Sequence, residues 1–312
     1  MLQSVKAFAP ATVANVSCGF DILGFAIDAM GDTVELVLKD EPGLVVVSIE
    51  GDGGKLPLEA KKNTCAVAIQ AMLDKLDSKV GMNIYLTKGL PLGSGMGSSA
   101  ASAVAALEAA NRLLGNPFEK KALLPFAIAA EEVACGAGHA DNVAPSLLGG
   151  FVLIRDYHPL DVVKLPVPSG LYCTLLHPHY ELKTADSRSV LRDQIPMKHA
   201  TIQSGNVAGL ISGLYESDFE LISRSLRDVI AEPYRAVLLP GFYEIKEALK
   251  SAGALGMGIS GSGPTLFALS VGRQTAEAVG EAGKEIYSKI GLGVDVYFSE
   301  INIKGAYVIE EK

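Results

Sequence analysis

The sequence predicts a mixed fold of strands and helices, of the α+β or α/β class, in two domains. Strand-like and helix-like segments alternate along all 312 residues. That length favours two domains, because a domain usually has roughly 150 residues. Three prolines gather within residues 157–168, as in a linker between domains. We therefore expect one domain over residues 1–160 and another over residues 161–312.

The first half of the chain starts with strands and continues with helices around a glycine-rich loop. Asp40-Glu41-Pro42-Gly43 is a turn signal between two β-rich runs. Asn63 is a preferred N-cap residue, and apolar residues recur at helical spacing after it. The expected elements are strands at 33–38 and 44–49, a helix at 64–76, a strand at 82–87, a loop at 89–97, helices at 98–114 and 120–134, the second ended by Gly136-Ala137-Gly138, and a strand at 151–155.

The second half continues the alternation and contains two notable loops. One is polar and carries two arginines, and the other is rich in glycine. The expected elements are a strand at 171–176, the polar loop at 180–196, helices at 204–230 and 241–251, the glycine-rich loop at 256–264, a strand at 265–270, a helix at 275–290 and two final strands.

The composition is that of a globular protein and excludes several classes. The chain has 27 Lys and Arg against 35 Asp and Glu, a net charge of −8, and is 49% hydrophobic. There is no basic excess for nucleic acid, and the hydrophobicity is too high for a disordered chain. No apolar run approaches the roughly 18 residues of a membrane span, and residues 1–10 do not resemble a signal peptide. We expect a cytoplasmic protein with neither a nucleic-acid nor a membrane partner.

The cysteines indicate no metal or redox site. Cys18, Cys65, Cys135 and Cys173 lie far apart in the sequence and form no CxxC pair. Zinc ribbons and redox dithiols need such pairs. We expect buried free thiols in a reducing compartment.

The strongest local signal is the glycine-rich segment 91–101, between a strand and an alanine-rich helix. Gly93, Gly95 and Gly97 alternate, so backbone N–H groups can approach an anion without obstruction by side chains. The helix N-terminus adds about half a positive charge. Ser98 and Ser99 offer hydroxyls to phosphate, metal or the helix cap. The pattern predicts phosphate binding, and the alternative is a tight turn with a serine cap.

Two better-known nucleotide motifs do not fit. The Walker sequence Gly-x4-Gly-Lys-Ser/Thr does not occur. One GxGxxG occurs at Gly256, Gly258 and Gly261, but a helix precedes it and a strand follows it. A dinucleotide fold needs strand, loop and helix in that order.

Four blocks in sequence order resemble the motifs of the GHMP kinases. They are residues 9–21, 91–101, 138–145 and 258–265, and the first and third resemble the forms found in the homoserine kinases of that family. The resemblance spans nearly the whole chain. It implies an α+β fold with an N-terminal domain like domain 2 of ribosomal protein S5 and a ferredoxin-like C-terminal domain, with the site between them. It also implies transfer of phosphate from ATP to L-homoserine, a step towards threonine, by a homodimer.

The resemblance assigns residues to ATP and Mg²⁺. Mg²⁺ prefers hard oxygen ligands and keeps several waters, and by the family pattern it is held by Ser99 and Glu131. Without the resemblance, Glu131 would be interpreted as a solvated acid beside Glu132. Asn63 is placed near the adenine, although a helix cap explains it equally well. The expected ATP-binding residues are Asn63, Pro91, Leu92, Gly93, Ser94, Gly95, Met96, Gly97, Ser98, Ser99, Ala100 and Ala101.

The resemblance also assigns residues to a small zwitterion with a hydroxyl group. Arginine binds both oxygens of a carboxylate, which suits Arg188 and Arg235, although surface salt bridges are the alternative for each. Asp21 suits the ammonium group. Asp141 lies nearby in the family's site, Asn15 is placed at the reacting hydroxyl, and His139 and Thr184 complete the pocket.

Two positions separate this chain from mevalonate kinases and galactokinases. Those enzymes place an aspartate as candidate base where this chain has Asn142, and a lysine where it has Thr12. A neutral amide cannot accept the proton. The resemblance therefore implies in-line transfer without a carboxylate base, with Asn15, Asn142 and Glu131 as the catalytic residues and the γ-phosphate taking the proton. Met96 and Ser262 are mild departures from the motifs.

Three other functions compete with this interpretation. Another GHMP kinase, acting on a sugar or mevalonate, should carry the aspartate base and lack the paired arginines. A non-catalytic nucleotide-binding protein need not retain Glu131 and Ser99. A serine hydrolase using Ser99 and His139 lacks the GxSxG nucleophile motif.

Overall fold

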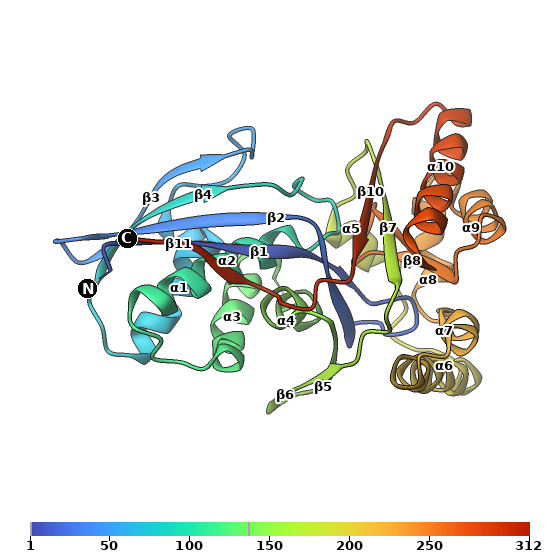
Figure 1. Ribbon diagram of the computed structural model, residues 1–312, viewed down its shortest axis with the longest axis horizontal. Helices are drawn as coiled ribbons and strands as arrows, with labels where there is room; N and C mark the ends of the chain where they lie inside the picture. The colour runs from blue at the N-terminus through green and yellow to red at the C-terminus, as the bar shows by residue number, and fades with distance from the viewer. Residues whose placement is uncertain (1, 137) are drawn as a thin grey trace.

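The computed structural model describes residues 2–136 and 138–312 of the chain. Two sheets follow one another along the longest axis of the molecule, and helices cover a face of each (Figure 1). The mixed α+β class expected from the alternation of strands and helices is confirmed. Across these described residues, no helix combines the length and apolarity needed to cross a membrane.

The first sheet has seven strands in the order β11-β1-β2-β4-β3, with β5 on β2 and β6 on β5. The long strand β2 joins its two parts, because one end pairs with β5 and the other with β4. The strands are β1 (Ser4–Ala14), β2 (Leu23–Lys39), β3 (Gly43–Glu50), β4 (Gly81–Thr87), β5 (Phe151–Tyr157), β6 (Leu160–Leu165) and β11 (Tyr307–Glu311).

Four α-helices pack beneath this sheet. Helix α2 is central and mostly buried, and its many alanines allow close approach to neighbouring elements. The N-cap predicted at Asn63 is confirmed, since its side chain accepts a hydrogen bond from the Cys65 amide. The helices are α1 (Thr64–Lys75), α2 (Ser98–Leu113), α3 (Leu124–Cys135) and α4 (Ala140–Leu148), with the 3-10 turns η1 (Ala60–Lys62) and η2 (Lys120–Leu123).

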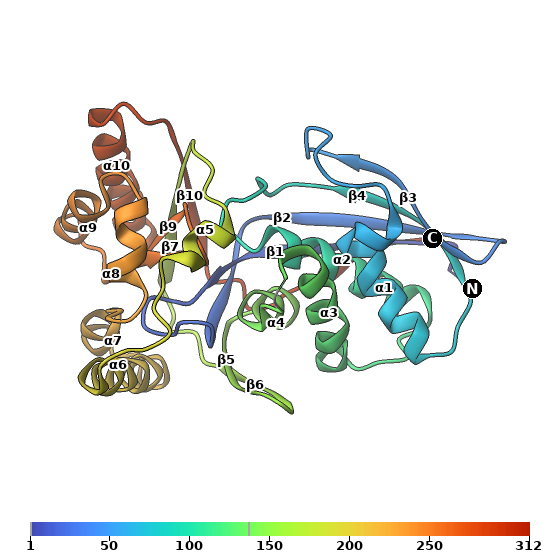
Figure 2. The ribbon, with the colours of Figure 1, turned by 180° about the vertical axis from the view of Figure 1, so that it is seen from behind.

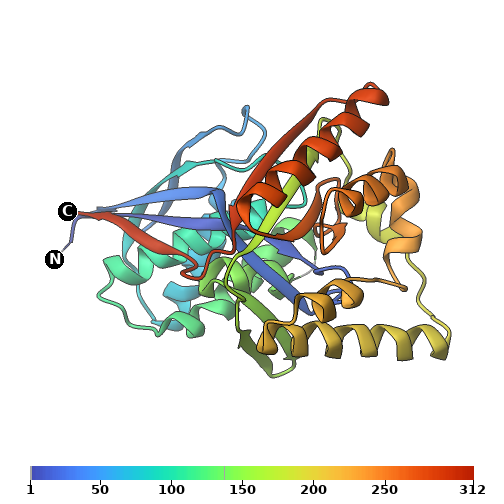
Figure 3. The same ribbon diagram turned by 45° about the vertical axis from the view of Figure 1, so that its right-hand side comes forward.

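The second sheet is antiparallel, in the order β10-β7-β9-β8. Helix α10 packs across three of its strands, and the long helix α6 runs along one side of the molecule (Figure 3). The elements are β7 (Leu171–Pro178), α5 (Thr184–Ser189), α6 (Met197–Glu216), α7 (Phe219–Ser225), α8 (Glu232–Arg235), η3 (Ala236–Leu238), α9 (Phe242–Ser251), β8 (Gly256–Ile259), β9 (Leu266–Val271), α10 (Arg273–Lys289) and β10 (Val294–Glu300).

Four expected segments differ from the structure. The loop expected at 180–196 contains α5, and β8 begins the loop expected at 256–264. The helix expected at 204–230 starts earlier and divides into α6 and α7, because Ser217 is left-handed and Asp218 caps α7. The helix expected at 120–134 begins with η2. At its end Gly136 is left-handed, and Ala137 of the expected stop lies outside the described residues.

The division at residues 160 and 161 stays a prediction, and two later segments belong to the first sheet. Strand β6 pairs with β5, and β11 pairs with β1. The two chain ends therefore lie side by side, and the Gln3 amide donates to the Lys312 carbonyl at 2.6 Å (Figures 1 and 3).

Three of the four cysteines are buried free thiols, as expected: Cys18, Cys65 and Cys173. Burial raises the pKa of the Cys18 and Cys65 thiols to about 12, so these groups stay protonated and unreactive. The side chain of Cys135 lies outside the described part of the chain.

Candidate active site

A cavity of about 400 Å³ opens between the two halves of the molecule. Helix α5 of the second half lies next to the first half here (Figure 2). The cavity brings together most of the residues predicted from the sequence. They are Asn15, Asp21, Asn63, Leu92, Gly93, Ser94, Gly95, Gly97, Ser98, Ser99, Glu131, His139, Asp141, Asn142, Thr184, Arg188 and Arg235.

Four predicted ATP-binding residues do not line the cavity. Met96, Ala100 and Ala101 are buried in the hydrophobic core, where they support the loop from behind. Pro91 precedes the lining part of the loop. Sequence reasoning in turn missed Lys88, which lines the cavity but belongs to no recognised motif.

The glycine-rich loop is left-handed at each of its alternating glycines, with φ of 66°, 78° and 68° at Gly93, Gly95 and Gly97. The conformation needs glycine, and at Gly95 a Cβ would lie 2.5 Å from the Ser260 carbonyl oxygen. Gly97 is the N-cap of α2 and contributes no side chain to the first turn. Instead of the serine cap considered above, the turn offers its backbone N–H groups to an anion.

The second glycine-rich loop braces the first, which explains the glycines that do not form a dinucleotide motif. The Ser260 hydroxyl donates to the Gly95 carbonyl at 2.7 Å. The Thr265 amide donates to the Ser94 carbonyl at 3.3 Å. The first glycine-rich loop is thus held by residues more than 160 positions away in the sequence.

Glu131 is a buried carboxyl group at the cavity. Burial raises the pKa of its side chain to about 7. A hydrogen bond with Ser99 and the charge of Lys88 lower the pKa, but by less than burial raises it. Within the described residues, Oε1 has no hydrogen-bond partner. A buried carboxylate oxygen without a partner is costly, and a cation beside it removes that cost. Glu131 and Ser99 therefore fit the hard oxygen donors expected for Mg²⁺.

The charged residues predicted for a zwitterion meet in the structure. Arg188 on α5 donates to the two oxygens of Asp21 at 2.9 and 3.3 Å. Its Nη2 also lies 3.3 Å from Nδ1 of His139, which must be the acceptor because arginine has none. Burial, then the Arg188 charge, lowers the pKa of His139, so this imidazole is neutral.

Arg235 on α8 is buried and fixed by backbone carbonyls. It donates to Ser187 at 3.2 Å and to Gly261 at 3.0 Å, and it lies 5.2 Å over the Phe20 ring. Thr184 approaches the Ser262 hydroxyl at 3.2 Å. Arg188 thus forms a partly exposed ion pair, as its alternative interpretation expected, whereas the buried Arg235 is not a surface salt bridge.

The turn after β1 holds the remaining polar groups. Asn15, Val16 and Ser17 are consecutively left-handed, a strained conformation for residues with side chains. The Asn15 side chain supports it by accepting from the Asp21 amide at 2.9 Å and donating to the Gly261 carbonyl at 2.7 Å. Each half of the Asn15 amide keeps one further hydrogen-bonding capacity for a ligand.

Asp141 is a second buried carboxyl group in the same cavity. Its pKa is raised to about 7, first by burial and then by the charge of Asp21. Of the groups the structure describes, none pairs with its Oδ1 atom. The cavity therefore has an acidic subsite that a ligand cation would neutralise.

The two positions that separate the chain from mevalonate kinases and galactokinases are in contact. The Thr12 hydroxyl donates to Oδ1 of Asn142 at 2.9 Å. Thr12 and Asn142 thus form a neutral pair at the two positions where the resemblance implies a lysine and an aspartate in those kinases.

Comparisons with known proteins agree with the geometry. The models of the GHMP kinases N terminal domain and the GHMP kinases C terminal match residues 63–150 and 210–289. The homoserine kinases of Chlorobium phaeobacteroides (strain BS1) and Chlorobaculum tepidum are each 52% identical to this chain. Both matches cover 99% of this chain, and they cover 100% of the first relative and 99% of the second.

Solved structures give the same result. The crystal structure of homoserine kinase from Cytophaga hutchinsonii has a TM-score of 0.97 and 55% identity, covering 99% of this chain and 98% of its own. The L. major mevalonate kinase, at 17% identity and a TM-score of 0.68 over 95% of this chain and 96% of its own, shares the fold.

Proposed function

Because this chain belongs to the homoserine kinases of the GHMP kinase family, we propose that it phosphorylates the side-chain hydroxyl of L-homoserine. The products are ADP and O-phospho-L-homoserine. The observation that carries the proposal is the layout of the cavity. The glycine-rich loop suits the phosphates of ATP, while two arginines and the carboxyl groups of Asp21 and Asp141 suit a zwitterion.

The loop 93–97 and the first turn of α2 would bind the phosphates of ATP, with Ser99 and Glu131 holding Mg²⁺. When bound, Mg²⁺ neutralises charge on the β and γ oxygens. Arg188 and Arg235 would bind the carboxylate, and Asp21 and Asp141 the ammonium group. Asn15 would then orient the hydroxyl for in-line transfer. In these roles the protein positions its two substrates and forms no covalent bond with either.

The transfer proceeds, in this proposal, without a protein base. Asn142 is neutral and accepts from Thr12, and His139 is already an acceptor for Arg188. The γ-phosphate then takes the hydroxyl proton. Placement rather than proton removal limits the rate.

We expect Asn142→Asp to leave kcat at or slightly below the wild-type value, within about tenfold. Thr12 can still donate to the new carboxylate, so the contact between β1 and α4 is kept. The measurement is kcat against pH for wild type, Asn142→Asp and Asn142→Ala. A hundredfold rise with a new acidic limb would show that proton removal limits the reaction and would overturn the base-free route.

We expect homoserine binding at pH 7 to release about half a proton per site. The pKa of Asp141 is about 7 in the free protein, and an ammonium group beside it favours the charged carboxylate. Calorimetric titration with homoserine in buffers of different ionisation enthalpy measures the release, which should fall to about a tenth of a proton at pH 8. Asp141→Asn is the control. Proton uptake, or equal release from the variant, would contradict this assignment.

The substrate itself is tested by ADP release from Mg-ATP with L-homoserine, mevalonate, galactose and L-serine in turn. Turnover with homoserine that stops when Mg²⁺ is chelated supports the whole proposal. Turnover only with mevalonate or galactose would keep the fold and discard the roles of Arg188, Arg235 and Asp21. Binding of ATP without any turnover would favour a nucleotide-binding protein without catalysis.

We also propose a setting for this activity: threonine biosynthesis in the cytoplasm, by a homodimer. The support is the family membership alone. Sedimentation of the purified protein decides the oligomeric state, and growth of a homoserine kinase-deficient strain carrying this chain decides the pathway.

A further inference from the structure

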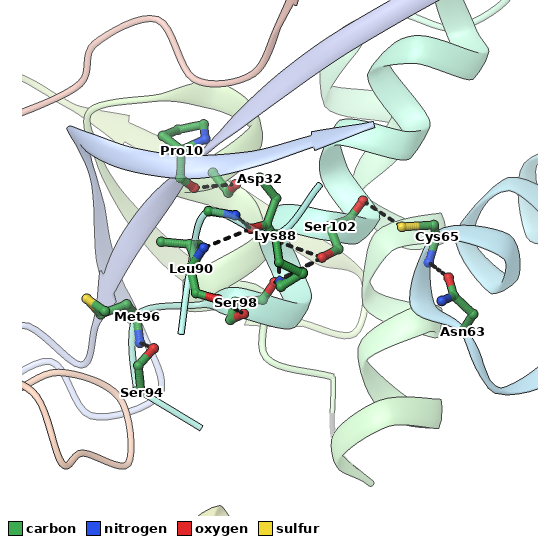
Figure 4. A network of polar contacts seen from close by, with 12 residues as sticks. Pro10, Asp32, Asn63, Cys65, Lys88, Leu90, Ser94, Met96, Ser98 and Ser102 are labelled. Carbon is green, nitrogen blue, oxygen red and sulfur yellow. Dashed lines mark hydrogen bonds and ion pairs between the residues drawn. The ribbon is translucent and has the colours of Figure 1, made fainter. Parts of the chain in front are cut away.

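A buried ion pair lies directly behind the phosphate-binding loop. Asp32 on β2 and Lys88, just after β4, have side chains that are 0% and 1% exposed (Figure 4). They are 56 residues apart and belong to none of the motifs discussed above. The pair joins the first sheet to the start of α2.

The hydrogen bonds of this pair are fully used inside the protein. The Lys88 ammonium donates to Asp32, to the Ser98 carbonyl at 2.8 Å and to the Ser102 hydroxyl at 2.9 Å. An ammonium group has three N–H bonds. Lys88 thus lines the cavity without an N–H left for a phosphate oxygen, so it is not a direct ATP ligand.

Asp32 holds the opposite end of the loop. Its Oδ1 accepts from the backbone amides of Gly89 and Leu90 at 3.1 and 3.2 Å. Its Oδ2 accepts from Ser102 at 2.6 Å as well as from Lys88. The pair therefore ties the entry of the loop, at residues 89–90, to its exit at the first turn of α2 (Figure 4).

The free-energy cost of burying the Asp32–Lys88 ion pair indicates whether the pair serves stability or positioning. A buried ion pair can often be replaced by uncharged residues with little loss of stability, whereas removal of one partner is strongly destabilising. Such a pair is weak support for a purely stabilising role. A rigid frame for the phosphate site, by contrast, requires fixed positions for both loop ends.

We propose that Lys88, Asp32 and Ser102 are positioning residues that fix both ends of the phosphate-binding loop and so set the affinity for ATP. The inference rests on the proposed function for the identity of the nucleotide. It predicts an effect on ATP that does not extend to homoserine.

The test is the double variant Lys88→Met/Asp32→Asn. The new amide can still accept from Gly89 and Leu90, which favours folding, while the link to Ser98 is cut. We expect the dissociation constant and KM for ATP to rise about tenfold, with KM for homoserine within twofold. Amide hydrogen exchange should quicken in residues 89–98 and stay unchanged in β7 and β9. A folded double variant with ATP affinity within twofold of wild type would overturn the proposal.

A matched control removes an ion pair at the other end of the same helix. Arg112 near the C-terminus of α2 pairs with Glu311 on β11 at 2.5 Å, on the surface. Arg112→Gln/Glu311→Gln should change neither the ATP affinity nor the exchange of residues 89–98. Equal effects in both double variants would assign them to general loosening of α2 and reject the proposal.

A milder variant keeps the proposal testable if the double variant does not fold. Ser102→Ala removes one donor to Asp32 and one acceptor of Lys88, and we expect ATP to bind about threefold more weakly. Unchanged affinity in that variant would reject the proposal. ATP binding is measured without homoserine. The comparison of ATP affinities between the variants and the wild type therefore holds even if homoserine is not the substrate. If the wild type binds no ATP, the proposed function fails and hydrogen exchange in residues 89–98 alone decides.

Discussion

Replacement of Glu131 by glutamine is expected to lower kcat about a thousandfold, which corresponds to about 4 kcal/mol of lost transition-state stabilisation. The proposed role of this carboxylate is to hold the cation that neutralises the transferring phosphate. Glutamine has nearly the same shape and no charge. The measurement is kcat at saturating ATP and homoserine over a range of Mg²⁺ concentrations. A kcat within tenfold of wild type would remove Glu131 from the proposed metal site.

The same variant should be more stable than wild type at pH 8. The pKa of Glu131 is about 7 in the folded protein and 4.5 as a model group, so the folded state binds the proton more tightly. The resulting penalty is absent below about pH 4.5, grows as the pH rises to about 7 and reaches about 3 kcal/mol above it. Urea unfolding at pH 4.5 and pH 8, without ligands, should show the gain only at pH 8.

A neighbouring glutamate provides the control for both measurements. Glu132 is exposed and does not line the cavity. Glu132→Gln should change neither kcat nor the free energy of unfolding. If Glu131→Gln lowered stability at pH 8, its carboxylate would have a stabilising partner, contrary to the cause given for its raised pKa.

Replacement of Arg188 by glutamine should raise KM for homoserine about a hundredfold and leave KM for ATP within twofold, because the proposed charged, two-pronged contact with the substrate carboxylate is lost. Arg188 is the better of the two arginines to test. Arg235 is buried and holds two backbone carbonyls, so its removal would disturb the fold as well as the pocket.

Arg192 is the matched control for this variant. It lies four residues further along the chain, beyond the end of α5, is exposed, and has its guanidinium carbon 5.1 Å from the centre of the Tyr234 ring. Arg192→Gln should leave KM for homoserine within twofold. Similar KM values for the two variants would show that the charge of this segment, rather than a contact of Arg188, attracts the substrate.

Local signals predicted much of the fold, including the glycine-rich turn at residues 93–97 and helix α2 after it. Glycine permits the left-handed backbone of this turn, and alanine favours the helix after it. Both effects act locally, so the sequence is enough to predict them. Helix α5 escaped prediction because it is short and polar, and its place depends on the contact between Arg188 and Asp21. Strand β1 was not delimited because alanines and a proline dilute its β-branched residues.

The long-range contacts of the site could not be predicted from residue patterns. Lys88 and Asp32 belong to no motif, and only the pairing of β2 with β4 brings them together. Glu131 has the sequence pattern of a solvated acid at a helix end, yet the packing of α3 buries it. The resemblance to a family located it, because the family pattern already contains the tertiary information.

Asp21 and Arg188 are in direct contact at the cavity and serve as mutual counterions before any substrate enters. In the proposed function, entry of homoserine exchanges this one internal ion pair for two ion pairs with the ligand. Ethanolamine would pair only with Asp21 and a hydroxy acid only with Arg188, so each would leave one charge unpaired. Glycerol or water would supply no charge at all. In the proposed function, this exchange therefore discriminates between ligands by their charges before the hydroxyl group is tested.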